Sequence, residues 1–339
     1  MQGIERYMSI CIHRGNADGI KAVSELLISG KVVALPTETV YGLAANALDE
    51  ESVRRIFEIK MRPLIDPLIV HFYDLNQLEK IAFIPPEAIT LAEHFWPGAL
   101  TIVLNKRPIV PDLVTASRET VAVRMPAKPE MREVLNRCGL YLAAPSANPF
   151  GYVSPTSAQH VVDSLGDRLD AVLDGGPCEF GLESTIINLS HPESPSILRK
   201  GPIAAESLEE VLGREVAQES SVLDSEMRKS GLIAPGTLSK HYSPRTQIQL
   251  QPNGFNALRD KLDCEAIVLF QRPTEIPHQN KQFYWLSETG NLAEAGKNLF
   301  KLLRNLDKKG LQKVSIEMAP AGGLGDTIND RLIRAAAKS

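Results

Sequence analysis

The stretch 57–71, FEIKMRPLIDPLIVH, joins two different kinds of secondary structure. Two cations, Lys60 and Arg62, stand directly before two prolines, and an apolar run, 68–70, then ends at His71. Proline has no backbone N–H and restricts the residue before it, so a helix should end near Lys60 and a short buried strand should follow. The stretch therefore indicates an α/β fold, in which the two cations either face solvent at a hinge or present positive charge to a ligand.

Helical and strand-like patterns alternate on both sides of this stretch. In 16–30 the apolar residues recur at helical spacing, while 31–36 is a buried apolar run that ends at a proline. The segment 36–42, PTETVYG, is expected to be a loop. The next expected helix is 49–60, and the next expected strands are 68–72, 120–126, 140–144 and 184–189. Helices and strands in this order predict an α/β core with a twisted sheet of mixed strand direction.

The length of 339 residues is typical of two domains. The first domain is expected to span 1–213, and the polar, serine-rich segment 214–245 is interpreted as a linker that is too long to be a simple connection. The last segment, 246–339, contains a strongly amphipathic helix at 291–308 and predicts a small Rossmann-like three-layer α/β/α domain with a mainly parallel sheet. Its other elements are expected at 265–270, 282–286 and 313–318 for the strands, and at 323–337 for the last helix.

Composition limits the classes of partner that the chain can recognise. With 43% hydrophobic residues, 23% charged residues and a formal net charge of −4, the chain resembles an ordinary soluble globular protein. An overall electrostatic attraction to nucleic acid or to an anionic membrane is therefore not expected. Any site for an anion must be a local cluster of cations.

The cysteines and the apolar segments bear on the cellular compartment. The four cysteines are far apart in the sequence and form no C-x-x-C pair, which argues against a zinc site and a disulfide framework and fits a reducing cytosol. The N-terminal segment lacks the apolar core of a secretion signal, and no apolar run approaches the roughly 20 residues that span a bilayer. We expect a soluble, cytoplasmic protein without a membrane partner.

Hydroxyl, amide and cationic side chains recur beside the expected strands of the first domain. Ligands of open α/β sheets gather at strand ends, and Lys and Arg there suit a phosphate-rich ligand. The joint recurrence predicts a site for a nucleotide or another polyanion. The candidates are Thr37–Thr39, Lys60, Arg62, His71, Thr120, Arg124, Ser146, Asn148, Glu183–Thr185 and Arg199–Lys200.

A purely structural explanation is open for each candidate taken alone. Lys60 can complement the dipole of its helix, and Arg124 can face solvent from its strand. His71 can be a hydrogen-bonded core histidine, and Ser146 and Asn148 can be turn residues between two prolines. The P-loop, the dinucleotide-binding glycine motif, H-E-x-x-H and G-x-S-x-G are all absent from the sequence.

Seven sequence motifs, from PTETVYGL at 36–43 to ILRKG at 197–201, occur in an order that resembles the YrdC-domain family. The element H-Y-S-P at 241–244 and the segment 323–337 are similar to the longer, two-domain form of that family, so the resemblance covers essentially the whole chain. It implies a YrdC-like catalytic domain, a linker that can act as a lid and a Rossmann-like domain. The motifs that carry the resemblance are PTETVYGL (36–43), K-x-R-P (60–63), PLIVH (67–71), VAVRMP (121–126), APSAN (144–148), EST (183–185) and ILRKG (197–201).

Members of this family are threonylcarbamoyl-AMP synthases. The resemblance implies condensation of L-threonine, bicarbonate and ATP to threonylcarbamoyl-adenylate, with release of pyrophosphate and water. The product would pass to the machinery that transfers the threonylcarbamoyl group to the tRNA adenosine next to the anticodon. Mg²⁺ is expected to arrive with ATP, and no tightly bound organic cofactor is expected.

The resemblance also implies roles for individual residues. Lys60 and Arg62 would be the catalytic cations, and His241 and Tyr242 would form the lid. The ATP site would comprise Lys60, Arg62, Asp66, Thr120, Ser146, Asn148, Ser154, Arg199 and Tyr242. The L-threonine site would comprise Thr39, His71, Arg124, Ala144 and Ser184.

Asp66 departs from the family pattern, which commonly has asparagine at this position. A carboxylate beside phosphates repels them unless it meets Mg²⁺ or a cation, so the role of Asp66 is open. Two other functions compete with the synthase. A carbamoyl-transfer protein of the hydrogenase-maturation type would carry additional modules ahead of the YrdC domain. An RNA-binding YrdC module without catalysis would use the same cations, although the net negative charge and the few aromatic residues near them argue against broad RNA affinity. Direct binding of tRNA stays open.

Overall fold

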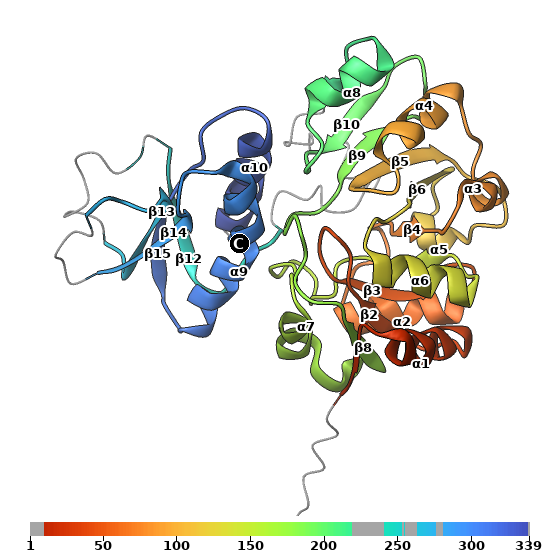
Figure 1. The fold of residues 1–339 in the computed structure, drawn as a ribbon, viewed down its shortest axis with the longest axis horizontal. Helices are drawn as coiled ribbons and strands as arrows, with labels where there is room; N and C mark the ends of the chain where they lie inside the picture. Colours follow the sequence, from red (N-terminus) through yellow and green to blue (C-terminus); the bar gives the residue numbers. More distant parts are fainter. Residues whose placement is uncertain (1–9, 219–240, 253, 255–262, 276–280, 338–339) are drawn as a thin grey trace, which may run out of the picture.

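The computed structural model describes residues 10–218, 241–252, 254, 263–275 and 281–337. These residues form two units, each built on its own sheet, which lie side by side in Figure 1. Of the predicted linker, only the ends at 214–218 and 241–245 belong to the described residues. No helix in this part of the chain has the length and apolar character needed to cross a membrane.

The first unit contains an 11-stranded sheet of mixed direction, as predicted. The strand order is β1-β8-β2-β3-β7-β4-β6-β5-β9-β10-β11; β4 runs parallel to β6, whereas β2 runs antiparallel to β3. The strands are β1 (Cys11–Arg14), β2 (Val33–Leu35), β3 (Gly42–Asn46), β4 (Ile69–His71), β5 (Leu100–Asn105), β6 (Thr120–Arg124), β7 (Leu142–Ala143), β8 (Ala171–Asp174), β9 (Thr185–Asn188), β10 (Ser196–Arg199) and β11 (Ala217–Gln218).

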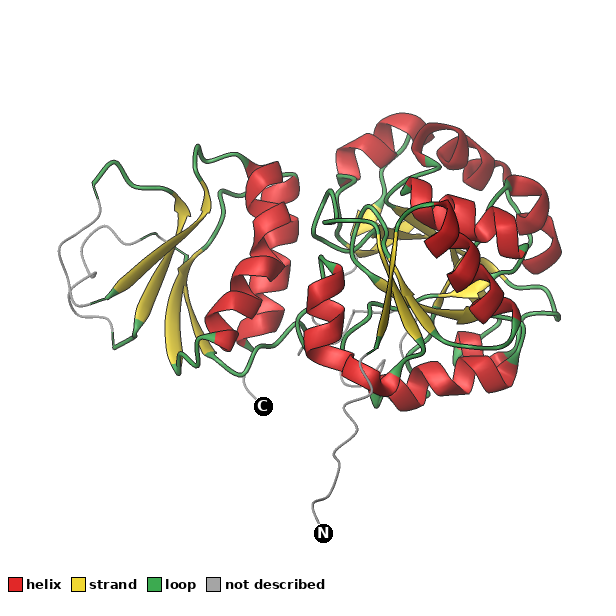
Figure 2. Cartoon of the chain, turned by 60° about the horizontal axis from the view of Figure 1, so that its bottom comes forward, coloured by secondary structure: helices red, strands yellow, loops and turns green. Residues whose placement is uncertain are grey.

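The helices of the first unit surround this sheet in Figures 1 and 2. Asp49 caps the helix before the stretch 57–71, and Met61 ends it with a left-handed backbone at φ 52°. The prolines then prevent the helix from continuing, so the chain turns into β4 as predicted. The helices are α1 (Ala17–Ile28), α2 (Glu50–Lys60), α3 (Leu75–Ile81), α4 (Pro86–Phe95), α5 (Asp112–Thr115), α6 (Pro129–Cys138), α7 (Ala158–Leu165) and α8 (Ala205–Leu212), with a 3-10 turn at Gly166–Arg168.

Strand β3 was not predicted, because the sequence indicates only a loop at 36–42 before the next helix. The strand begins at Gly42 and pairs with β2 and β7, although its sequence, GLAAN, has none of the β-branched residues that favour strands. A Cβ atom at Gly42 would lie 3.2 Å from the Cβ of Ala144, so the small side chains allow the two backbones to approach closely. The local sequence therefore does not indicate this strand, whose small residues are suited to the close packing of the two backbones.

The second unit has a four-stranded, fully parallel sheet with the order β12-β15-β13-β14. Its described helices, α9 and α10, both lie between this sheet and the first unit in Figures 1 and 2. The parallel sheet was predicted, but β12 was not, because its alternating Gln and apolar residues directly follow the polar linker. The elements are β12 (Gln247–Gln251), β13 (Ala266–Gln271), β14 (Gln282–Ser287), α9 (Leu292–Lys308), β15 (Lys313–Glu317) and α10 (Leu324–Ala336).

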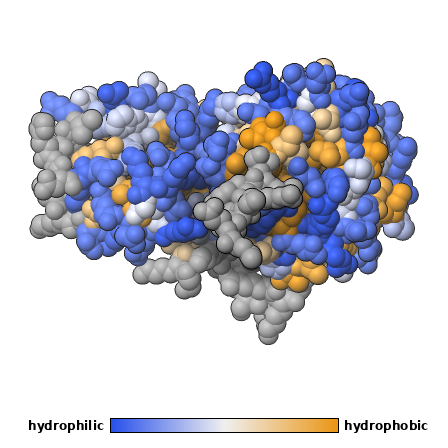
Figure 3. All heavy atoms as spheres, turned by 90° about the horizontal axis from the view of Figure 1, so that it is seen from below, coloured by the Kyte–Doolittle hydropathy of each residue, from blue (hydrophilic) through white to orange (hydrophobic). Residues whose placement is uncertain are grey.

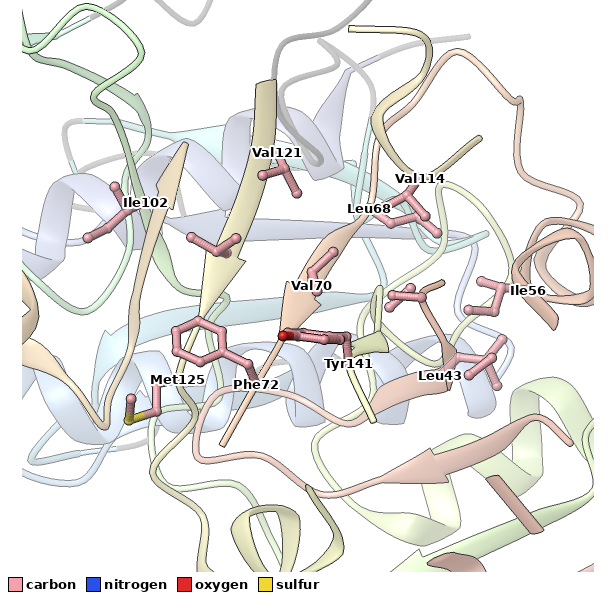
Figure 4. Close-up of a cluster of buried hydrophobic side chains, with 14 of the residues drawn as sticks. Leu43, Ile56, Leu68, Val70, Phe72, Ile102, Val114, Val121, Met125 and Tyr141 are labelled. Carbon is pink, nitrogen blue, oxygen red and sulfur yellow. The ribbon is translucent and has the colours of Figure 1, made fainter. Parts of the chain in front are cut away.

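Apolar side chains fill the first unit and continue into the contact between the units. Figure 4 shows part of the main core, where Val70 and Phe72 lie near Tyr141, and the Phe72 ring meets Trp96 edge to face at 5.3 Å. Each fully buried side chain of this size stabilises the fold by about 1.5–3 kcal/mol. A second cluster combines Leu182 of the first unit with residues of α9 and α10, so the two units share buried apolar surface. Polar side chains dominate the face drawn in Figure 3.

Candidate functional site

A small cavity lies where the loops after β2 and β7 meet strand β4, the end of β6, the loop before β9 and the end of β10. Its volume is about 50 Å³. Most of the predicted site residues surround it, so segments far apart in the sequence do converge on one place. The lining residues are Thr37, Thr39, Val40, Gly42, Arg62, Ile69, His71, Arg124, Ala144, Pro145, Ser146, Glu183, Ser184, Arg199, His241 and Tyr242.

Lys60, at the end of α2, is fully buried behind the cavity wall. Its Nζ donates to the carbonyl oxygen of Ser146 at 2.5 Å and to that of Asn148 at 2.6 Å. Its own carbonyl accepts from the backbone N–H of Phe150 at 2.8 Å. Burial lowers the pKa of Lys60 well below its usual value. The ammonium group therefore fixes the loop 146–150, which the sequence alone allowed to be an ordinary turn.

Arg62 and Asp66 form a buried ion pair, with 2.9 Å between Nη2 of Arg62 and Oδ1 of Asp66. The same guanidinium donates to the carbonyl oxygens of Asp66 and Pro67 at 3.2 and 2.8 Å. Burial raises the pKa of Asp66, and the charge of Arg62 opposes this effect. Arg62, four residues earlier, therefore supplies the positive charge beside the Asp66 carboxylate.

Arg124, at the end of β6, is buried and does not face solvent. Its Nη2 lies 2.6 Å from Oε1 of Glu38, and its Nη1 donates to Oγ1 of Thr39 at 2.9 Å. Burial tends to raise the pKa of Glu38, but Arg124 outweighs this and lowers it below the usual value. Glu38 therefore stays ionised and holds the guanidinium in one orientation at the cavity.

His71 ends β4 next to Arg124 and is also buried. Burial, followed by the positive charge of Arg124, lowers the pKa of His71 to about 3. The imidazole is therefore neutral at physiological pH. Its Nδ1 has no hydrogen-bond partner among the described residues.

Ser184 and Arg199 form another part of the cavity wall. Nε of Arg199 donates to the carbonyl oxygen of Ser184 at 3.1 Å, and Nη2 donates to its hydroxyl at 3.0 Å. That hydroxyl also lies 2.7 Å from Oγ1 of Thr101. Burial lowers the pKa of Arg199 to about 10, so the guanidinium keeps its charge.

His241 and Tyr242, the end of the predicted linker, are buried against this wall. The His241 ring meets Phe150 edge to face at 6.2 Å, and the Tyr242 ring stacks on Phe300 of α9 at 5.3 Å. Tyr242 has a left-handed backbone at φ 60°, which is uncommon for a residue with a bulky side chain. The segment thus reaches the cavity from one side and the second unit from the other.

Five predicted residues lie outside the cavity lining. Asn148 donates from its side-chain amide to the carbonyls of Pro149 and Tyr152, and the hydroxyl of Ser154 donates to Glu183 at 2.6 Å. Lys60 and Asp66 stand behind the wall, as described above. Thr120 is farther away, because it begins β6 while Arg124 ends it.

Unpartnered buried polar atoms gather at this site. They include Nδ1 of His71, Oδ1 of Asn148, Nδ1 of His241 and the hydroxyl of Tyr242. Buried polar groups are almost always hydrogen-bonded in native proteins, because an unmade bond costs free energy. Their concentration around one cavity lined by three arginines indicates a site for a polar, anionic ligand.

Two contributors to the site were not assigned by the sequence. Glu38 lies in the candidate loop after the first strand, but the sequence indicates no role for it. Arg331, in the last helix of the second unit, forms an ion pair with Glu183 at 2.9 Å. An arginine on the apolar face of an amphipathic helix is a sequence signal for a buried ion pair. The partner of Arg331, however, lies 148 residues away in the sequence.

Both units of the chain match models of known protein families. Residues 25–201 match the Sua5/YciO/YrdC family model, described as "Telomere recombination", and residues 203–337 match the model described as "Threonylcarbamoyl-AMP synthase, C-terminal domain". A threonylcarbamoyl-AMP synthase of Pyrococcus abyssi is 38% identical over 324 residues, or 93% of each chain. One of Bacillus subtilis is 36% identical over 329 residues, covering 95% of this chain and 94% of the relative.

A solved structure is similar over nearly the full length. The crystal structure of P. abyssi Sua5 complexed with L-threonine matches with a TM-score of 0.87 and 35% identity, covering 96% of this chain and 97% of the other. The arrangement of the two units is therefore close to that of a protein whose crystal contains L-threonine.

Proposed function

Because the chain belongs to the Sua5/YciO/YrdC family of threonylcarbamoyl-AMP synthases, we propose that it makes threonylcarbamoyl-adenylate from L-threonine, bicarbonate and ATP. The amine of threonine attacks bicarbonate to form a carbamate and water. A carbamate oxygen then attacks the α-phosphorus of ATP, and pyrophosphate leaves. The product passes to the machinery that transfers the threonylcarbamoyl group to tRNA, at the adenosine next to the anticodon.

The observation that carries this proposal is the convergence of buried cations on one cavity. Arg62, Arg124 and Arg199 line the cavity from three different segments, and Lys60 stands behind its wall. Little covalent chemistry falls to the protein in this reaction, because both bond-forming steps join substrates. Positioning and neutralisation of negative charge are therefore its main contributions.

The ion pairs divide the cavity into two proposed halves. Arg124, fixed by Glu38 and Thr39, is proposed to receive the carboxylate of threonine, since its charge and planar fork suit a carboxylate. His71 and Ser184 would complete that half with neutral hydrogen-bonding groups. In this division the triphosphate meets Lys60, Arg62 and Arg199. Asp66 would keep Arg62 oriented, so that it acts through the guanidinium rather than on the phosphates.

We propose that His241 and Tyr242 move when substrates enter. The cavity of about 50 Å³ is far smaller than the roughly 300–1,000 Å³ of pockets that hold drug-sized ligands, so ATP does not fit beside the buried Tyr242 ring. A segment that leaves for binding and returns afterwards acts as a lid. Its return would exclude water from an adenylate that hydrolyses readily.

Mg²⁺ is proposed to arrive with ATP rather than at a site of the protein's own. No group of three His, Cys, Asp or Glu side chains suitable for a metal occurs in the described part of the chain. Bound to the phosphates, Mg²⁺ would neutralise part of their negative charge. We further propose a cytoplasmic location, where ATP and tRNA are available.

Pyrophosphate release tests this function. The full chain is incubated with ATP and Mg²⁺, with L-threonine and bicarbonate added separately and together. Release that requires both additions is expected, and release that ignores threonine overturns the proposal. Absence of turnover, combined with RNA binding that weakens steeply with salt, would favour the RNA-binding alternative instead.

A further inference from the structure

One buried arginine of the second unit reaches into the first unit beside the cavity. Arg331 of α10 is fully buried, and its Nε lies 2.9 Å from Oε2 of Glu183 in the loop before β9. Its Nη2 donates to the carbonyl oxygen of Lys200 at 2.7 Å, and its Nη1 pairs with Asp330 at 2.6 Å. All three arms of the guanidinium are therefore used, and two of them hold the first unit.

The groups held by Arg331 belong to the cavity itself. Oε1 of Glu183, the second oxygen of the same carboxylate, accepts from the hydroxyl of Ser154 at 2.6 Å. The next residue, Ser184, is the one that Arg199 binds through both its carbonyl and its hydroxyl. A shift of Glu183 would consequently move groups of both proposed halves of the cavity.

The same guanidinium also contacts the proposed lid. The Cζ atom of Arg331 lies 5.1 Å from the centre of the Tyr242 ring, within the range of a cation–π interaction. Such an interaction is stronger away from water, and both side chains are fully buried. Arg331 thus joins the wall of the cavity to the segment that covers it.

Another buried arginine of the second unit provides a comparison. Arg304 of α9 donates to the carbonyl oxygens of Val153 and Ser154 and to the hydroxyl of Ser164, so it also ties the two units together. Among the described residues, its hydrogen bonds reach neither Tyr242 nor a side chain that lines the cavity. Its Cζ atom lies 5.0 Å from the centre of the Tyr152 ring.

From this geometry we infer that Arg331 is a positioning residue for the adenylate-forming site, through which the second unit orients Glu183 and holds Tyr242 closed. The inference rests on the proposed synthase function and gives the second unit a role in it. It also explains why a carboxylate, Glu183, can line a cavity proposed for a triphosphate. Its charge is balanced by the guanidinium of Arg331 from the second unit, whose Nε lies 2.9 Å from the carboxylate.

The test compares Arg331→Lys and Arg331→Met with Arg304→Met in the full chain. Each variant is checked for folding by its melting temperature, and its ATP affinity is measured by calorimetry alongside kcat and KM for pyrophosphate release. Arg331→Met is expected to raise the KM for ATP by about tenfold, and Arg331→Lys by about fivefold, because a single ammonium cannot reach Glu183 and Lys200 together. Arg304→Met is expected to lower the melting temperature while the KM for ATP stays within about threefold.

A double variant separates positioning from simple packing. In Glu183→Gln/Arg331→Met neither charge remains, so the buried carboxylate is no longer left without its cation. We expect this variant to recover at least about threefold of the ATP affinity lost in Arg331→Met. Equal loss in all variants, in proportion to their melting temperatures, overturns the inference, as does a wild-type KM and ATP affinity in Arg331→Lys. A wild-type chain without threonine-dependent turnover would instead overturn the proposed function, while the ATP affinities would still test Arg331.

Discussion

The Nζ atom of Lys60 lies 2.5 Å from the carbonyl oxygen of Ser146, so the first cation of the stretch 57–71 is bonded to the loop after β7. A second bond, to the carbonyl of Asn148, uses another of its three protons. The helix end that looks like a hinge in the sequence is therefore the anchor of a loop at the cavity. Under the proposed function, the third donor of the ammonium group is the one that would meet a phosphate.

Replacement of Lys60 tests whether this anchor also serves ATP. Lys60→Met keeps most of the side-chain volume but removes the charge and both hydrogen bonds to the loop, so the KM for ATP should rise by about tenfold or more. Lys106→Met is the control, because that ammonium pairs with Asp112 and does not line the cavity. Equal ATP kinetics in the wild type and Lys60→Met would remove Lys60 from the nucleotide site.

Arg124 is expected to bind threonine rather than ATP. In Arg124→Lys the charge stays, but one ammonium cannot pair with Glu38, bond Thr39 and meet a substrate carboxylate with the geometry of the planar fork. The KM for L-threonine should rise by about tenfold, with the KM for ATP changed less than about threefold. Both are read from pyrophosphate release at saturating co-substrate. A larger effect on ATP than on threonine would contradict the assignment.

The hydroxyl of Tyr242 offers a test that separates stability from function. It is buried and has no hydrogen-bond partner among the described residues, so Tyr242→Phe should leave the free energy of unfolding unchanged or raise it slightly. The KM for ATP should nevertheless increase if this hydroxyl meets the nucleotide. Tyr41→Phe is the matched control, because the Tyr41 hydroxyl donates to the carbonyl of Gly176 at 2.7 Å; it should lose about 1 kcal/mol of stability. A destabilised Tyr242→Phe with normal ATP kinetics would contradict the prediction.

Part of the fold could be predicted from the local sequence, whereas strands β1, β5, β8 and β10 and helices α3 to α7 were not predicted. Proline after a helix predicted the end of α2 at Lys60 correctly, and the short apolar run predicted a strand at 68–72 where β4 spans 69–71. Strand β3 was missed because its small residues carry no strand signal and are chosen by the close approach of the backbone at Gly42. Strand β12 was missed because only Ile248 and Leu250 alternate with glutamines beside a polar linker.

The site could be predicted as a set of residue types but not as a set of pairs. Cations beside buried strands are informative because a buried charge is costly without a partner, and this holds for Arg124. Its partner, Glu38, is 86 residues away and becomes adjacent only when the loop after β2 meets the end of β6. The pair between Arg331 and Glu183 requires the docking of two separate units. Pairings of this kind depend on tertiary structure, which residue spacing does not contain.

The neutral state of His71 makes stability depend on pH. Burial, and next Arg124, lower its pKa in the folded chain to about 3 from an ordinary value of 6.5. Between these values the unfolded chain binds a proton that the folded chain does not, so the stability is complete above pH 6.5 and falls as the pH decreases. One such group contributes about 1.4 kcal/mol per pH unit.

Urea unfolding between pH 4 and 6 measures this contribution. His71→Asn should flatten the dependence of unfolding free energy on pH by about one proton relative to the wild type. His191→Asn, which replaces an exposed histidine, is the matched control. Identical slopes in His71→Asn and the wild type would mean that His71 is protonated in the folded chain.

The most direct test of the central claim follows the carbon of bicarbonate into the product. The full chain is incubated with ATP, Mg²⁺, L-threonine and ¹⁴C-bicarbonate, and labelled adenylate and pyrophosphate are quantified together. Threonylcarbamoyl-adenylate synthesis predicts label in a threonine-containing adenylate, in equal amount to the pyrophosphate released. Pyrophosphate without label in an adenylate, or label that does not require threonine, would contradict it.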